Sequence, residues 1–370
     1  MSGIYIHIPF CRSRCIYCGF YSSTRHDLRQ RYVDAVCREM ELRAEGKERI
    51  STIYLGGGTP SQLSAAQLHQ LFIYINKVYD TTDVAEVTIE CNPDDVTDSF
   101  ARELAALPVD RVSMGVQTFS NERLRFLHRR HTAEQIPLAV QRLRDVGIGN
   151  ISIDLMYGFP AETLADWHRD IEAALCLDVE HLSAYALSYE EGTPLHRLLR
   201  QGEVQENDEE TERQMYDALI DRLGEWGYEH YEISNFARQG FRSCHNSSYW
   251  HGVPYIGLGA AAHSYDGSTW RQWNVSDIER YIAGIESGYP DTDGEVLDED
   301  TRYNERVMTA LRTCEGLALD LLPERQRAYC TEQAQRFLGD GLLTLRDNCL
   351  TLTRRGLFVS NMVMSGLMMA

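Results

Sequence analysis

The sequence has no run of about 18 or more apolar residues, and residues 1–10 lack the basic and apolar regions of a signal peptide. We therefore expect no transmembrane segment and a cytoplasmic location. Positive charge is also scarce, because 36 Lys and Arg stand against 55 Asp and Glu, a formal net charge of −19. Nucleic acids and anionic membranes attract basic surfaces, so neither is expected as the main partner.

A second pair of closely spaced metal ligands is also missing, although the chain has three cysteines within eight residues, Cys11, Cys15 and Cys18. A structural zinc site needs four ligands, and no later C-x-x-C or H-x-x-x-H pair completes one. Three thiolates at this spacing can hold an iron–sulfur cluster and leave one iron open. The remaining cysteines have no ligand spacing and are expected to pack in the core: Cys37, Cys91, Cys176, Cys244, Cys314, Cys330 and Cys349.

Short apolar runs alternate with longer amphipathic ones up to about residue 190, which is typical of repeated βα units on a parallel sheet. The expected strands are 3–8, 51–55, 86–91, 111–117, 150–154 and 181–187. The expected helices between them are 28–46, 64–79, 97–106, 132–146 and 164–177. This pattern fits a doubly wound sheet or an incomplete barrel, and in both the ligand lies at the carboxyl ends of the strands.

Polar and glycine residues follow several of the predicted strands. The run Gly56-Gly57-Gly58-Thr59 follows the second strand, and no Gly-Lys-Ser/Thr makes it a phosphate loop. Glu90 ends the third strand and Gln117 ends the fourth, so both would face the same mouth. Each of these features alone is as compatible with a tight turn or a solvated side chain as with a binding site.

The region after residue 190 is predicted to contain an acidic helix at 205–226, a strand-like segment at 228–237 and a linker near 266–275. Helices at 276–287, 300–314 and 324–338 are expected to precede two short strands across the Asp347-Asn348 turn and a helix after Gly356. We expect residues 1–270 to form the sheet domain with its extension, the core being about 1–190. Residues 271–370 would form a small, mostly helical, winged-helix-like domain that serves as a lid or an interaction surface.

The segment Tyr5-Ile6-His7-Ile8-Pro9-Phe10-Cys11, followed by C-x-x-x-C-x-x-C spacing, resembles the radical S-adenosylmethionine (SAM) superfamily. Within that superfamily it is most similar to the oxygen-independent coproporphyrinogen III oxidase group. The resemblance implies an α/β fold with an incomplete, TIM-like (β/α)6 barrel. It also implies that Cys11, Cys15 and Cys18 hold a [4Fe–4S] cluster whose open iron chelates SAM, and that an electron from the reduced cluster cleaves SAM.

The same resemblance assigns SAM contacts residue by residue. The matching positions are Tyr5, Tyr17, Gly57, Gly58, Thr59, Glu90, Gln117, Arg129, Asp154 and Ala186. Some of them could belong to a second SAM site, which this protein need not keep.

The stretch His245-Asn246-Ser247-Ser248-Tyr249-Trp250 is the second informative one. Its residues alone fit a helix-capping histidine with two core aromatics at least as well as a heme site. However, His-Asn-x-x-Tyr-Trp resembles the signature of a heme-binding, heme-chaperone branch of the group. His245 is therefore the candidate heme ligand, with His251 and His263 as rivals.

We expect a heme chaperone that binds a [4Fe–4S] cluster, SAM and heme and delivers heme to an acceptor, such as a respiratory hemoprotein at the membrane. An electron donor for the cluster is also expected. The alternatives are an oxygen-independent coproporphyrinogen III dehydrogenase of porphyrin biosynthesis and a radical SAM enzyme on another substrate. Dehydrogenase activity is not expected, because Phe20 stands where those enzymes carry a further cysteine, and only ten residues precede Cys11.

Overall fold

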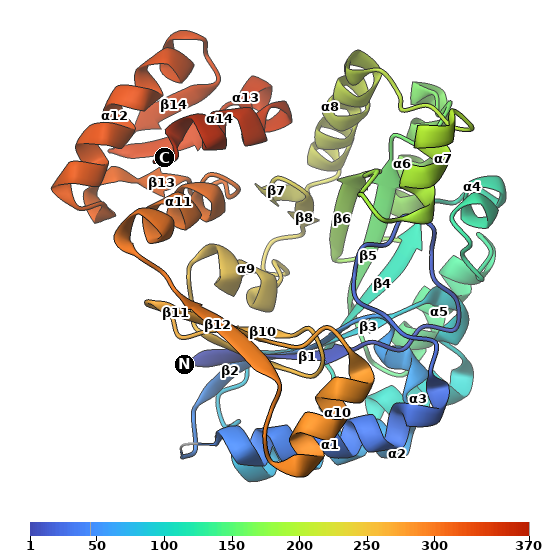
Figure 1. Ribbon diagram of the computed structural model, residues 1–370. Coiled ribbons are helices and arrows are strands. Elements are labelled where there is room, and N and C mark those ends of the chain that lie inside the picture. The colour runs from blue at the N-terminus through green and yellow to red at the C-terminus, as the bar shows by residue number, and fades with distance from the viewer. Residues whose placement is uncertain (45, 370) are drawn as a thin grey trace.

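Strands and helices alternate through the first half of the chain in the computed structural model, which describes residues 1–44 and 46–369 (Figure 1). The strands are β1 (Ser2–Ile8), β2 (Ile50–Gly57), β3 (Glu86–Cys91), β4 (Arg111–Gln117), β5 (Asn150–Tyr157) and β6 (His181–Ala186). The helices that follow them are α1 (Arg29–Arg43), α2 (Ala65–Val78), α3 (Asp98–Ala105), α4 (Asn121–Phe126), α5 (Gln135–Asp145) and α6 (Leu164–Cys176). The predicted βα units are therefore present.

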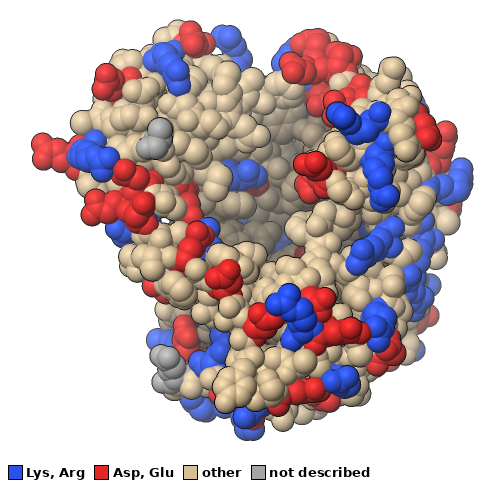
Figure 2. Space-filling model, in the orientation of Figure 1, with Lys and Arg blue, Asp and Glu red and all other residues tan. Residues whose placement is uncertain are grey.

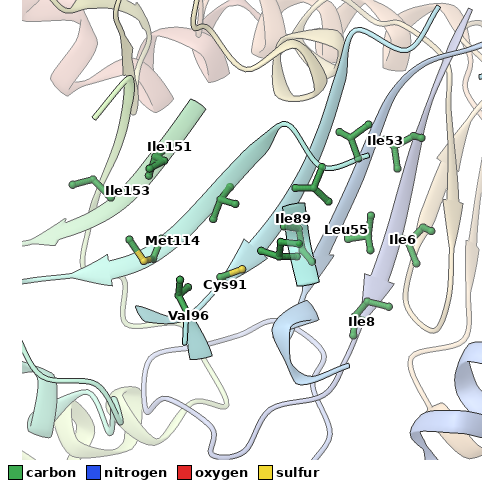
Figure 3. Close-up of a cluster of buried hydrophobic side chains, with 14 of the residues drawn as sticks. Ile6, Ile8, Ile53, Leu55, Ile89, Cys91, Val96, Met114, Ile151 and Ile153 are labelled. Atoms are coloured by element: carbon green, nitrogen blue, oxygen red, sulfur yellow. The ribbon is translucent and has the colours of Figure 1, made fainter. Parts of the chain in front are cut away.

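Each strand has one apolar face and one polar face. In β4, Val112, Met114 and Val116 are buried in the large hydrophobic core, whereas Arg111 and Ser113 line an internal cavity. Successive side chains of a strand point to opposite faces, so this alternation fixes which face carries the helices. Figure 3 shows the apolar side, with isoleucines, Leu55, Cys91 and Met114 from neighbouring strands packed together.

Local capping defines where the helices begin. The Ser64 hydroxyl accepts a hydrogen bond from the backbone N–H of Gln67 at the start of α2, and the Gln67 side-chain oxygen accepts one from the backbone N–H of Ser64. Thr163 and Asp166 form the same reciprocal pair at the start of α6. Such capping boxes satisfy backbone donors that the helix itself leaves unpaired.

The strand order confirms the expected incomplete barrel. One sheet runs β12-β11-β10-β9-β1-β2-β3-β4-β5-β6-β8-β7, and its two end strands, β12 and β7, are not neighbours. The strands β1 to β6 are parallel and in chain order, and β9 (Tyr255–Leu258) adds a further parallel strand beside β1. The sheet is therefore open, with helices α1 to α6 on its outer side (Figure 1).

The chain between residues 190 and 265 adds strands to both edges of the parallel sheet. It contains α7 (Pro194–Gln201), α8 (Glu209–Glu225), β7 (Glu229–Glu232), β8 (Asn235–Ala237), α9 (Cys244–Trp250) and β10 (His263–Tyr265). The strand-like segment expected at 228–237 is a hairpin, because β7 pairs antiparallel with β8, and β8 pairs with β6. Helix α9 lies on the inner side of the sheet and contacts β2.

The linker expected near 266–275 is wrong. This segment contains β11 (Trp270–Asn274), which pairs antiparallel with β10 and with β12 (Thr292–Val296). Helix α10 (Ile278–Ser287) packs into the same core as the barrel through residues such as Tyr281 and Ile282. We therefore propose that the boundary between the two units lies near residue 297 rather than at 271.

The C-terminal unit, residues 297–369, has its own hydrophobic cluster, which begins at Tyr303. Its elements are α11 (Glu299–Ala310), β13 (Leu317–Ala318), α12 (Glu324–Gly339), β14 (Leu343–Arg346), β15 (Cys349–Leu352), α13 (Arg354–Phe358) and α14 (Ser360–Leu367). The predicted turn at Asp347 and Asn348 joins β14 to β15, and both residues have positive φ, 48° and 58°. The last helical part begins at Arg354, slightly before the predicted Gly356.

All ten cysteines are free thiols. Cys176, Cys244 and Cys314 are exposed, so the expectation that every cysteine outside the triplet packs in the core is wrong for these three. Among the helices of residues 1–44 and 46–369, none combines the length and the apolar character that crossing a bilayer requires.

Candidate functional site

A cavity of about 740 Å³ lies on the inner side of the sheet. Its lining includes the three cysteines of the triplet and all ten positions predicted to contact SAM: Cys11, Cys15, Cys18, Tyr5, Tyr17, Gly57, Gly58, Thr59, Glu90, Gln117, Arg129, Asp154 and Ala186. These residues come from six separate strands and the loops that follow them. The parallel arrangement therefore brings the predicted residues together, and their individual binding roles stay predictions.

The cysteine triplet forms one wall of this cavity. Cys11 Sγ lies 3.6 Å from Thr59 Oγ1, and Arg129 Nη1 lies 3.6 Å from Cys15 Sγ. Burial raises the pKa of the Cys11 thiol and raises that of Cys18 to about 11. Thr59 and Arg129 act in the opposite direction and favour the thiolate of Cys11, which is the form that binds iron.

The donor set, three thiols that line one cavity, suits an iron–sulfur cluster. In the described part of the chain, no three His, Cys, Asp or Glu side chains approach closely enough to hold one metal ion. A [4Fe–4S] cluster places its cysteine ligands on separate iron atoms, so its thiolates need a wider spacing than zinc ligands do. Cys11, Cys15 and Cys18 line one cavity and would hold the cluster there.

The glycine run at the end of β2 leaves no room for side chains at Gly57 and Gly58. Gly57 has φ +113°, and a Cβ atom at this position would lie 2.5 Å from the His7 ring. A Cβ atom on Gly58 would lie 2.7 Å from the Pro9 backbone, because the Gly58 N–H donates to the Ile8 carbonyl at 2.9 Å. The loop is thus pressed against the end of β1 and exposes backbone to the cavity, as close binding of a ligand demands.

Glu90 and Asp154 bring two carboxyl groups into the cavity. Glu90 accepts hydrogen bonds from Tyr54 Oη at 2.8 Å and from the Gly57 N–H at 3.0 Å. Burial raises its pKa to about 7, although both hydrogen bonds act against this shift. Burial also raises the pKa of Asp154, which accepts a weak hydrogen bond from Ser113 at 3.5 Å. Such carboxyl groups can bind ribose hydroxyls or an ammonium group.

Arg129 and Gln117 lie at the carboxyl end of β4. The Arg129 guanidinium donates to Asn92 Oδ1 at 2.6 Å and to the Gly115 carbonyl at 2.5 Å. Gln117 has φ +68°, and the strand pairing shifts between Gly115 and Gln117. The shift re-aims the Gln117 side chain toward the cavity, a common use of bulges next to binding sites.

His245 does not line the cavity. Its Nδ1 lies 2.8 Å from Thr52 Oγ1, its Nε2 lies 2.9 Å from Tyr249 Oη, and its ring stacks on Tyr54 with centroids 5.0 Å apart. The ring is fully buried, and this burial, with a smaller contribution from the Arg111 charge, lowers its pKa to about 3. The imidazole is therefore neutral.

The heme-ligand roles of the histidines stay predictions. The neighbour of His245, Asn246, does line the cavity. The rival residues His251 and His263 are exposed; His251 bonds the Ser247 carbonyl through Nδ1, and His263 lies beside Trp273.

Two residues that the sequence reasoning missed, Glu86 and Arg111, begin β3 and β4 on the inner face of the sheet. Glu86 accepts hydrogen bonds from the backbone N–H groups of Cys244 at 2.7 Å and His245 at 3.1 Å, which fixes the first turn of α9 to β3. Arg111 lines the cavity and is only 1% exposed. Both lie on the polar face of a strand. The alternation of polar and apolar residues along β3 and along β4 was the sequence signal that could have identified them.

The face drawn in Figure 2 is hollowed between the C-terminal unit and α8. Few Lys, Arg, Asp or Glu side chains lie on the walls of this hollow, whereas its rim carries many of both signs.

Comparisons with known proteins agree with this geometry. The family models "Radical SAM superfamily" and "HemN C-terminal domain" match residues 5–174 and 297–359. The chain is 34% identical to the heme chaperone HemW of Bacillus subtilis over 98% of both chains, and 35% identical to HemW of Mycobacterium tuberculosis over 99% of this chain and 94% of that one. The solved coproporphyrinogen III oxidase HemN of Escherichia coli superposes with a TM-score of 0.85 over 99% of this chain and 89% of its own. At 22% identity, that likeness concerns the fold.

Proposed function

Because the chain belongs to the HemW family of the radical SAM superfamily, we propose that it binds a [4Fe–4S] cluster, SAM and heme and delivers heme to an acceptor hemoprotein. The observation that carries this proposal is the single cavity that contains the cysteine triplet, the glycine loop and the strand-end residues, with Asn246 of α9 on its wall. The geometry of the cavity supports the cofactors, and the relatives support heme as the cargo.

The residues divide into two groups in this proposal. Cys11, Cys15 and Cys18 hold the cluster, which when reduced supplies the electron for cleavage of SAM. The backbone of Gly57 and Gly58 binds the methionine end of SAM, and the remaining predicted positions bind and orient the rest: Tyr5, Tyr17, Thr59, Glu90, Gln117, Arg129, Asp154 and Ala186. Glu90 also positions the glycine loop, since it accepts a hydrogen bond from the Gly57 N–H at 3.0 Å.

We assign heme to the α9 wall, with His245 as the ligand. A neutral imidazole is the form that binds iron, and the low pKa of His245 keeps it neutral. Nε2 must first leave its hydrogen bond to Tyr249, which belongs to the same short helix. Heme binding by His245 therefore requires a local rearrangement of α9.

Outside the chain, the proposal requires an electron donor for the cluster and a heme acceptor, which we expect to be a respiratory hemoprotein at the membrane. We propose that the protein works in the cytoplasm. The ten free thiols support a reducing compartment, where disulfides are rare.

A transfer experiment tests this function. Protein reconstituted anaerobically with iron and sulfide is loaded with heme, separated from free heme and mixed with the apo form of a b-type cytochrome. We expect uptake of heme by the reconstituted protein, followed by appearance of the cytochrome spectrum. Failure to take up heme, or retention of all heme after mixing, would contradict the proposal.

The enzymatic alternatives are tested separately. Phe20, at the position where a dehydrogenase carries a further cysteine, is 74% exposed at the edge of the cavity, so no thiol is present there. The likeness to coproporphyrinogen III oxidase concerns the fold and does not support a role in porphyrin biosynthesis. We expect no decarboxylation of coproporphyrinogen III with SAM and reductant, whereas 5′-deoxyadenosine formed only with some other substrate would indicate a different radical SAM enzyme.

A further inference from the structure

Arg111 carries a buried positive charge without a partner. Its side chain is 1% exposed, and its Nε and Nη1 atoms have no hydrogen-bond partner among the described residues. The four other arginines that line the cavity all have partners, Arg12 on Gln62 and Arg14 on the Ser22 carbonyl. Arg129 donates to Asn92 and Gly115, and Arg130 pairs with two acidic side chains at 2.9 and 3.1 Å.

The strand register explains why Arg111 faces the cavity. It is the first residue of β4 and lies between Thr88 of β3 and Asn150 of β5. The side chains of Arg111 and Ser113 share the inner face of the strand and line the cavity. The guanidinium is therefore built into the cavity wall rather than directed to solvent.

An unpaired charge in this position destabilises the folded protein, because desolvation is costly unless an opposite charge compensates it. Two carboxyl groups, Glu90 and Asp154, line the same cavity, but Glu90 bonds Tyr54 and Gly57, and Asp154 bonds Ser113. Neither forms an ion pair with Arg111 in the described part of the chain, although the Arg111 charge acts to lower the pKa of both, so they compensate it only at longer range. Its planar fork of donors is thus available to a carboxylate that a ligand brings.

We propose that Arg111 binds a propionate carboxylate of the tetrapyrrole that the cavity receives, an assignment that rests on the proposed function. Arg111 lies close enough to α9 that its charge acts on His245, and Asn246 of α9 lines the cavity as well. The ligand then lies between the β4 and α9 walls. The carboxylate of SAM is the other possible source, but Arg111 and Gln117 are at opposite ends of β4, roughly 20 Å apart along the strand. The cysteine loop lies at the Gln117 end.

The test compares heme with its dimethyl ester, in which both propionates are esterified. Three reconstituted proteins are titrated with each compound and followed by absorbance: the wild type, Arg111→Gln and Arg130→Gln. Arg130→Gln is the control, because Arg130 is already paired with acidic side chains. We expect the wild type and Arg130→Gln to bind heme at least about tenfold more tightly than the ester, as a charge-assisted hydrogen bond would provide. Arg111→Gln should lose this preference.

Equal binding of heme and ester by the wild type would overturn the assignment, even if Arg111→Gln failed to fold. Retention of the preference in folded Arg111→Gln would also overturn it. SAM affinity, measured by equilibrium dialysis, should be the same in Arg111→Gln and the wild type. If Arg111→Gln bound SAM tenfold more weakly but kept the preference for heme over the ester, Arg111 would be assigned to SAM instead. If the wild type bound neither compound, the proposed function itself would fail, and this assignment with it.

Discussion

Glu90 Oε2 accepts a hydrogen bond from the backbone N–H of Gly57 at 3.0 Å, so the acid that ends β3 holds the glycine loop that follows β2. The second carboxylate oxygen, Oε1, accepts from Tyr54 Oη at 2.8 Å. Tyr54 in turn stacks on His245. One carboxyl group thus connects the predicted SAM contacts with the helix that carries the candidate heme ligand.

The first prediction concerns the charge of Glu90. Glu90→Gln keeps an oxygen acceptor but loses the negative charge, so SAM, which is cationic at its sulfonium and ammonium groups, should bind about tenfold or more weakly at pH 8. Because the pKa of Glu90 is about 7, wild-type affinity should increase from pH 6 to pH 8 as the carboxylate forms. Equilibrium dialysis of the reconstituted proteins measures both effects, and the same pH dependence in wild type and variant would contradict them.

The same group predicts a pH dependence of stability. The pKa of Glu90 in the folded protein, about 7, is above the ordinary value of 4.5, so its stabilising contribution is complete below pH 4.5 and is lost as pH rises to 7. As the pH rises over this interval, the free energy of unfolding of the wild type should therefore fall by on the order of 3 kcal/mol relative to that of Glu90→Gln. Denaturant unfolding at pH 5 and pH 8 measures it, and a shift in the opposite direction would refute the assignment.

A third prediction concerns the glycine loop. Gly57→Ala should lower the free energy of unfolding by about 1–3 kcal/mol and weaken SAM binding, since alanine is strained at φ +113° and its Cβ meets the His7 ring. Gly149→Ala is the matched control, because that position has open space and no positive φ. Denaturant unfolding and SAM dialysis compare the two variants, and equal behaviour would show that the loop tolerates a side chain.

The fourth prediction separates cluster ligands from other thiols. Cys11→Ser, Cys15→Ser and Cys18→Ser should each lose most of the iron and acid-labile sulfide after anaerobic reconstitution. Cys176→Ser, which removes an exposed thiol outside the cavity, should keep the wild-type content. Iron and sulfide analysis decides the matter, and full iron content in any triplet variant would remove that cysteine from the ligand set.

The fifth prediction identifies the heme ligand. His245→Ala should weaken heme binding at least tenfold and change the heme absorption spectrum, whereas Tyr249→Phe should bind heme at least as tightly as wild type, because Nε2 no longer has to leave a hydroxyl. His251→Ala and His263→Ala serve as controls on exposed histidines. Circular dichroism confirms that each variant is folded. A loss confined to either control would transfer the ligand role to that residue.

Sequence periodicity was sufficient for the βα units, whereas the choice of an incomplete barrel over a doubly wound sheet depended on the family resemblance. The rule that ligands lie at the carboxyl ends of parallel strands placed Glu90 and Gln117 at one predicted mouth, and the family resemblance added residues as distant as Tyr5 and Ala186; all four line the cavity. Periodicity is a local signal, and so it could not show that β9 joins β1 or that residues 270–274 form a strand. Those pairings depend on contacts between segments that are far apart in the chain.

The same limit applies to single residues. Arg111 begins its strand, where a charged side chain is usually read as solvent-facing, and only the alternation with Val112 places it inside. The burial of His245 depends on Thr52, Tyr54 and Tyr249, which meet only in the folded chain. Seven residues of helix are too few for the sequence pattern to show which face is buried.

Electron paramagnetic resonance of the reduced, reconstituted protein with and without SAM tests the central claim most directly. If the three cysteines leave one iron open inside the cavity, the protein binds a [4Fe–4S] cluster, and addition of SAM changes the spectrum of the reduced cluster. Glu90→Gln at the same SAM concentration should lose this change. A cluster whose spectrum is the same with and without saturating SAM would contradict the account.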